Sequence, residues 1–259
     1  MLQFDAETAR ILDNGYQGGD IQRRRLANLA ALAPKRGEVI ADIGAGTGLL
    51  ALDLSRAVGD DGTVIAIDPS SEMRAATAAR CTERGNVRVV DGAADALPLD
   101  DASIDRAVSL QVFEYLEDIP AALLELRRVL RPGGRLAIGD LHWDSHVWHA
   151  DDAARMDGML RIWDRHLTHR NTPALLPPLL REAGFRVETV LPELCHDTTF
   201  RPDGLAMLMT HLIQAYAAQN RLATEEESDA WAKEQRRMAA EGRFFFAITH
   251  YVVVASRGP

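Results

Sequence analysis

The sequence predicts an α/β fold: a doubly wound, mostly parallel sheet of seven strands with helical insertions. From residue 38 onward, short β-branched runs alternate with longer runs of helical period, which is typical of βαβ units. A glycine loop over residues 42–48 stands where the first of these strands ends and the first helix begins. The 259 residues, 47% of them hydrophobic and 26% charged, suit one globular domain.

The elements of the sheet follow in order. Residues 1–37 are expected to form an N-terminal helical segment, with a helix from about Asp20, a candidate N-cap, to Leu32. Five strands are predicted at Val39–Ile43, Val64–Asp68, Val87–Val90, Ile104–Ser109 and Leu136–Gly139. The helices between them are predicted at Leu49–Val58, Ser71–Glu83 and Pro120–Leu130. The Pro and Gly residues at 131–134 stop the last of these helices in a turn. Residues 38–140 are thus expected to form the ligand-binding core.

Residues 141–259 are expected to complete the sheet within the same domain, with helical insertions on the substrate side at about 141–184 and 201–241. Residues 141–170 hold five of the eight histidines and three of the four tryptophans and are not expected to form sheet. A helix from Thr172 to Glu182 precedes a strand at Phe185–Val190. Thr224 and Glu227 predict a capping box in the second insertion. The apolar run Phe244–Ala255 supplies the last strand.

Composition restricts the partners. The chain has 29 Lys and Arg against 38 Asp and Glu, a net charge of −9, which disfavours nucleic acid. The apolar runs are too short to cross a bilayer, and residues 1–10 lack the apolar stretch of a secretory signal, so a cytoplasmic protein without membrane contact is expected. Cys81 and Cys195 are far apart and encode neither a disulfide framework nor a zinc ribbon. A homo-oligomer is left open.

The glycine loop indicates the kind of ligand. Its glycines run G-x-G-x-G, and Leu49 occupies the position where a dinucleotide fold has its third glycine. The preceding strand ends at Asp42, whose carboxylate would repel a pyrophosphate but suits a cationic amino-acid group. Asp68 ends the second strand, where a carboxylate can accept hydrogen bonds from the two hydroxyls of a ribose. These residues predict a positively charged nucleoside ligand without phosphate.

Four ordered motifs carry a family resemblance. They are the loop 42–48, Asp68-Pro69-Ser70-Ser71-Glu72-Met73, Gly92-Ala93-Ala94-Asp95-Ala96-Leu97-Pro98 and Leu130-Arg131-Pro132-Gly133-Gly134. Together they resemble class I S-adenosylmethionine (SAM) dependent methyltransferases, nearest to the type 11, UbiE-like branch. The resemblance implies a Rossmann-like fold, SAM as cofactor, and transfer of a methyl group to an O, C or N atom of a small molecule such as an aromatic or polyketide-like secondary metabolite.

The resemblance also implies roles for individual residues. The glycine loop would lie under the methionine part of SAM with Asp42 nearby, Asp68 would hold the ribose, and Pro69 and Met73 would flank the adenine. The family usually has an Asp where this chain has Ala93, so backbone groups of Ala93 and Ala94, or the carboxylate of Asp95, are expected at the adenine instead. Gln111 is expected to face the cofactor. The predicted cofactor-binding residues are Asp42, Gly44, Ala45, Gly46, Gly48, Asp68, Pro69, Met73, Ala93, Ala94 and Gln111.

Catalysis of methyl transfer needs alignment of a nucleophile and, for some acceptors, removal of a proton. The segment after the fifth strand passes over the methyl group in this fold, so His142 and Asp144 are the predicted catalytic residues, with helix capping as the alternative for each. A metal site at His142, His146 and His149 is a weaker alternative, and no metal is predicted.

Two other points stay open at the level of the sequence. Trp143, Trp148 and Trp163, together with Phe244–Phe246, fit either an aromatic acceptor pocket or plain core. The alternatives to methyl transfer are a SAM-binding enzyme that catalyses a rearrangement or cyclisation, and an NAD-dependent dehydrogenase, against which Leu49 counts.

Overall fold

The computed structural model describes residues 15–258, so the first part of the predicted segment 1–37 and the expected lack of a signal in residues 1–10 lie outside the described residues. The strands are β1 (Val39–Ile43), β2 (Thr63–Asp68), β3 (Val87–Asp91), β4 (Ile104–Leu110), β5 (Leu130–Leu141), β6 (Val147–Trp148), β7 (Phe185–Asp197) and β8 (Phe246–Arg257). The α-helices are α2 (Gly19–Leu32), α3 (Leu49–Val58), α4 (Ser71–Arg80), α5 (Ile119–Val129), α6 (Ala153–Asp164), α7 (Thr172–Glu182), α8 (Leu205–Gln219) and α9 (Glu225–Ala240). Two 3₁₀ turns are η1 (Phe113–Tyr115) and η2 (Trp143–Ser145).

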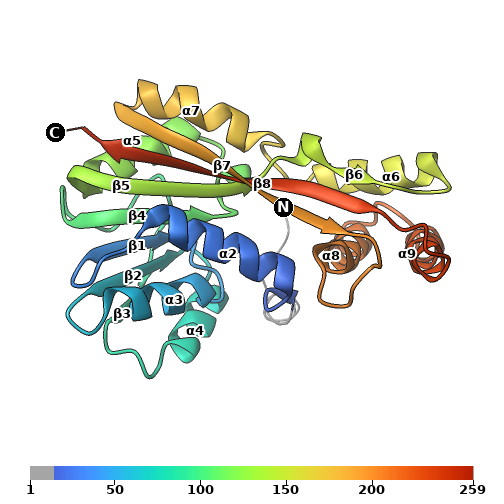
Figure 1. Ribbon diagram of the computed structural model, residues 1–259, viewed down its shortest axis with the longest axis horizontal. Coiled ribbons are helices and arrows are strands. Elements are labelled where there is room, and N and C mark those ends of the chain that lie inside the picture. Colours follow the sequence, from blue (N-terminus) through green and yellow to red (C-terminus); the bar gives the residue numbers. More distant parts are fainter. Residues whose placement is uncertain (1–14, 259) are drawn as a thin grey trace.

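The predicted doubly wound sheet is confirmed. Strands β3, β2, β1, β4 and β5 lie side by side in this order and are parallel, and β8 pairs antiparallel with β5 and with β7 (Figure 1). One face of the sheet is covered by α2 and α3, whose Leu32 and Leu54 are fully buried. The other face is covered by α5 and α7, through Leu126 and Leu180. The chain reverses its order at β1 and β4, where α/β sheets place their ligand crevice.

A third apolar cluster lies beyond the parallel strands. There β7 and β8 continue as a long antiparallel ribbon toward α6, α8 and α9 (Figure 1). Trp143, Trp148 and Trp163 are at most 8% exposed and belong to this cluster. All three therefore belong to the core, and Trp143 and Trp163 also line a small cavity that adjoins the site described below, whereas Trp148 borders a separate pocket beside α6. The predicted capping box of Thr224 and Glu227 is present at the start of α9.

Several predicted boundaries are wrong. Residues 141–170 do contribute to the sheet, because β5 reaches Leu141 and Val147–Trp148 pair with β8. The turn expected at 131–134 is part of β5, although α5 does end before it. Strand β7 runs to Asp197 rather than to Val190; its polar residues and Pro192 hide the strand pattern, which β7 tolerates because only β8 pairs with it among the described strands.

The ends of helices and of the last strand also differ from the prediction. The N-cap of α2 is Gly18, while Asp20 lies within the helix and accepts hydrogen bonds from Leu205 N and from Arg201. This buried carboxylate therefore ties α2 to the start of α8. Helix α4 ends at Arg80, before the predicted Glu83, and β8 begins at Phe246 rather than Phe244. None of the helices within residues 15–258 combines the length and the apolar character needed to cross a membrane.

Candidate active site

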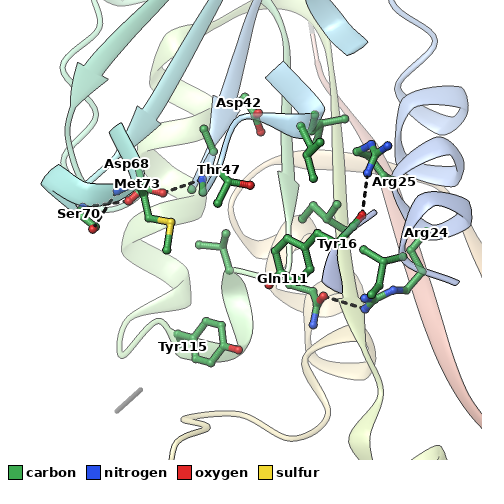
Figure 2. Close-up of a pocket in the computed structure, with 18 of the residues that line it drawn as sticks. Tyr16, Arg24, Arg25, Asp42, Thr47, Asp68, Ser70, Met73, Gln111 and Tyr115 are labelled. Carbon is green, nitrogen blue, oxygen red and sulfur yellow. Dashed lines mark hydrogen bonds between the residues drawn. The ribbon is translucent and has the colours of Figure 1, made fainter. Parts of the chain in front are cut away.

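A cavity of about 340 Å³ lies at the carboxyl edge of the parallel strands, between the loops that follow β1, β2 and β4 and the helix α2 (Figure 2). Most of the predicted cofactor-binding residues meet there. Those that line the cavity are Asp42, Gly44, Ala45, Gly46, Asp68, Pro69, Met73 and Gln111. Short segments that are far apart in the sequence thus converge on one space because parallel strands end at the same edge of the sheet.

The glycine loop is held by the second strand. Gly44 N and Ala45 N donate to Ile67 O at 2.8 and 3.0 Å, and the backbone at Gly44 and Gly46 has positive φ values of 70° and 55°. The carboxylate of Asp68 accepts from Gly46 N and from Ser70 N, both at 2.9 Å (Figure 2). Asp68 therefore fixes the loop and still has lone pairs left for hydroxyl donors of a ligand.

Asp42 is a buried carboxylate at the wall of this cavity. Burial and the charge of Asp68 raise its pKa from 3.8 to about 7, and Oδ2 has no hydrogen-bond partner among the described residues. A cationic ligand group would lower this pKa, since an opposite charge favours the ionised form, and it would give Oδ2 a partner. The site therefore fits the positively charged nucleoside that the sequence predicts.

Replacement of Asp42 by Asn is expected to stabilise the ligand-free protein at high pH. A pKa that is raised by folding contributes stability below the unfolded value, near 3.8, and this stability is lost as the pH rises to about 7. The difference corresponds to at most about 4 kcal/mol. In urea unfolding at pH 4 and pH 8, the free energy of unfolding of the variant should exceed that of the wild type only at pH 8. A gain independent of pH would contradict the expectation.

The side of the cavity that α2 provides was not predicted from the sequence. Tyr16, Ile21, Arg24 and Arg25 line it, and Arg25 is held by Asp53 at 2.8 Å. The run Arg23–Arg25 in a helix before the core was the available signal. The run alone does not tell which of the three side chains reaches the cavity. In the structure Arg24 and Arg25 line it, whereas the side chain of Arg23 is 44% exposed.

A second, smaller space of about 30 Å³ adjoins the first. Tyr16, Arg24, Gln111 and Tyr115 line both spaces and form a polar junction between them. The remaining walls are apolar and come from three parts of the chain: Leu141, Trp143, Trp163, Leu205, Leu208, Met209 and Leu212. The loop after β4 and the helix α8 therefore bound a place where an apolar molecule could meet a ligand in the larger cavity.

Five predicted site residues do not line the cavity. Gly48 lies at the start of α3 against Thr77, Ala94 is buried in the core, and Ala93 forms a β-bridge with Ala96. His142 precedes η2 with its ring beside Tyr251, and Asp144 is exposed and paired with Arg170 at 3.0 Å. The catalytic role of His142 and Asp144 stays a prediction that their placement does not support.

The histidine-rich segment makes other contacts. His146 Nδ1 lies 2.6 Å from Trp143 O, and the ring of His149 packs on Phe245. Within residues 15–258, no three side chains of His, Cys, Asp or Glu come together in a way that could hold a metal ion.

Comparison with known proteins agrees with this geometry. Residues 41–138 match the family model of a methyltransferase domain. An O-methyltransferase of Aspergillus nomiae is 31% identical over 60% of this chain and 68% of its own length. The UbiE C-methyltransferase of ubiquinone and menaquinone biosynthesis from Rubrivivax gelatinosus is 39% identical over 56% of each chain. A SAM-dependent methyltransferase from Aquifex aeolicus shares the fold, with a TM-score of 0.57, 19% identity, and coverage of 96% of this chain and 99% of its own.

The first curated relatives are matched over only 58 to 66% of their own length. Residues 41–138, which match the family model, contain the glycine loop, Asp68 and Gln111, and the structure brings these to one cavity. The chain belongs to the methyltransferases, and its fold is that of the class I SAM-dependent enzymes.

Proposed function

We propose that this protein transfers a methyl group from SAM to an oxygen, carbon or nitrogen atom of a small apolar molecule. The observation that carries the proposal is the pairing of two unlike spaces: a cavity built on the glycine loop, with Asp42 and Asp68 on its wall, and an apolar space that joins it at Gln111 and Tyr115. The names of its relatives, O-methyltransferases and quinone C-methyltransferases, support the same class of reaction.

The chain provides a distinct group for each part of SAM. Asp68 would accept the ribose hydroxyls, and Asp42 would face the cationic part beside the glycine loop. Met73, 3% exposed, and Pro69 would flank the adenine. SAM supplies an electrophilic methyl group on a sulfonium sulfur. Binding by fixed residues aligns that group with the acceptor, and alignment alone can supply most of the rate enhancement.

The acceptor would enter at the junction beside Gln111 and Tyr115 with its apolar part toward α8, because the smaller space itself, about 30 Å³, holds only one or two water-sized groups. Trp143, Trp163 and Leu208 form walls that exclude water and match a flat or hydrophobic molecule. Trp143 is held in place by a hydrogen bond of 2.7 Å from Nε1 to Glu114. A nucleic acid does not suit this enclosed space or the net charge of −9.

Calorimetric titration with SAM and with NAD tests the cofactor, and mass spectrometry tests the reaction. We expect micromolar binding of SAM and none of NAD. Incubation with SAM and a panel of phenols, enols and amines should yield a product heavier by one CH₂, together with S-adenosylhomocysteine. Binding of NAD in place of SAM would overturn the proposal. Conversion of a panel member to a rearranged or cyclised product without mass gain would favour a SAM-binding enzyme that transfers no methyl group.

A further inference from the structure

Arg24 is a buried cation at the junction of the two spaces. The residue is 1% exposed, yet it lines both the larger and the smaller cavity. Nη1 donates to Gln111 Oε1 at 2.8 Å, while Nε is buried without a hydrogen-bond partner among the described residues (Figure 2). Within residues 15–258, Arg24 takes part in none of the ion pairs, unlike its neighbours Arg23 and Arg25.

Among the described residues no carboxylate forms an ion pair with Arg24. Glu114 is fully buried, and burial raises its pKa, whereas the charge of Arg24, which reaches Glu114 through the intervening Gln111, acts in the opposite direction and lowers it. His250 is also fully buried, and burial together with the charge of Arg24 keeps its pKa well below the ordinary value. Burying an unpaired charge is costly, so the arrangement suits a ligand that brings a negative charge to the guanidinium.

We propose that Arg24 binds the methyl acceptor through an anionic oxygen, so that the acceptor is a phenolate, enolate or carboxylate on an apolar body. This inference rests on the proposed methyl transfer. The apolar body would point from the larger cavity toward Trp143 and Leu208, which line the smaller space together with Arg24; that space, about 30 Å³, has to widen to admit more than a water-sized group. Gln111 acts as a positioning residue, because its side-chain oxygen holds the guanidinium at the junction.

Methyl transfer to an anionic oxygen needs no general base. In the transfer step the anionic oxygen forms a bond to the methyl carbon, the carbon–sulfur bond breaks, and its electron pair stays on sulfur. The negative charge of the oxygen and the positive charge of the sulfonium are both lost, and no proton moves in the step. An acceptor that binds already ionised would therefore explain why neither His142 nor Asp144 lines the cavity.

An anionic oxygen could also come from the carboxylate of the cofactor. Calorimetry with SAM and with 5′-methylthioadenosine, which lacks that carboxylate, separates the two sources. If Arg24 serves the acceptor, Arg24→Gln should bind both nucleosides as the wild type does. Weakened binding of SAM alone would assign the guanidinium to the cofactor and overturn the proposal.

The direct test measures the preference for anions. Benzoate and 2-naphthoate, with benzamide and 2-naphthamide as neutral counterparts, are titrated into the full chain with and without S-adenosylhomocysteine. We expect the wild type to bind each carboxylate at least about 10-fold more tightly than its amide. Arg24→Gln should abolish this preference, and Arg24→Lys should restore part of it. Arg23→Gln removes the same charge from the same helix but away from the cavity, and should behave as the wild type.

The outcomes distinguish this inference from the proposed function. A wild type without preference for carboxylates, or a preference that survives in Arg24→Gln with an unchanged unfolding midpoint, overturns the role of Arg24. A protein that fails to bind SAM but keeps an anion preference dependent on Arg24 refutes the proposed methyl transfer and leaves the anion site in place.

Discussion

Replacement of Asp68 by Ala is expected to reduce the affinity for SAM at least about 100-fold, which is about 2.7 kcal/mol. The carboxylate has two tasks, because it holds the amides of Gly46 and Ser70 and is the group placed to accept the ribose hydroxyls. Hydrogen bonds to a charged acceptor contribute about 1.5–3 kcal/mol each. The loop should therefore loosen as well, but the free energy of unfolding should fall by less than the lost hydrogen bonds alone would give, because Asp68 is buried with a raised pKa and its charge opposes that of Asp42.

Asp91→Ala is the matched control for this prediction. Asp91 ends β3 and stands opposite Asp68 in the register of the two strands, but its side chain is 71% exposed and pairs only with Arg74 among the described residues. An exposed ion pair of this kind contributes less than about 1 kcal/mol, so binding of SAM should be unchanged. Calorimetric titration and urea unfolding of both variants give the answer. Equal affinities in Asp68→Ala and the wild type would remove Asp68 from the site.

The part of the site that could be predicted from the sequence is the part built from local motifs. Asp42, the glycine loop and Asp68 each belong to a short segment where a strand ends, and the parallel sheet brings such ends together. The fold class could be predicted for the same reason, because the alternation of strands and helices shows in the pattern of consecutive residues. Boundaries failed where pairing is long-range: β7 extends to Asp197 because β8 pairs with it, a contact that no local pattern reveals.

The acceptor side could not be predicted in the same way. Arg24, Gln111 and Leu208 come from α2, the loop after β4 and α8, and they meet only through tertiary packing. One contact that places α8 beside α2 is the buried Asp20, which accepts hydrogen bonds from Arg201 and Leu205 more than 180 residues away. The position of His142 and Asp144 after β5 predicts candidate bases. The 3₁₀ turn η2 instead directs Trp143 to the cavity and leaves Asp144 exposed.

Gly44→Ala and Gly46→Ala are expected to fail for different reasons, although both positions have positive φ and both residues line the cavity. A Cβ at Gly44 would lie 2.3 Å from Cγ2 of Val112, so the variant should lose about 3 kcal/mol or more of stability from clash and backbone strain together. A Cβ at Gly46 would meet nothing within 4 Å. Gly46→Ala should therefore lose only about 1–2 kcal/mol of stability, from backbone strain.

Gly37→Ala separates strain from loss of ligand space. Gly37 also has positive φ, and a Cβ there would meet nothing within 4 Å, but the residue does not line the cavity. Gly37→Ala should lose the same roughly 1–2 kcal/mol as Gly46→Ala by urea unfolding, because the strain is alike. Calorimetry should then show SAM binding as in the wild type for Gly37→Ala and weakened at least about 10-fold for Gly46→Ala, whose methyl group occupies ligand space.

Adding Val112→Ala to Gly44→Ala should recover part of the lost stability, and equal stabilities of the single and double variants would show that the clash is not the cause.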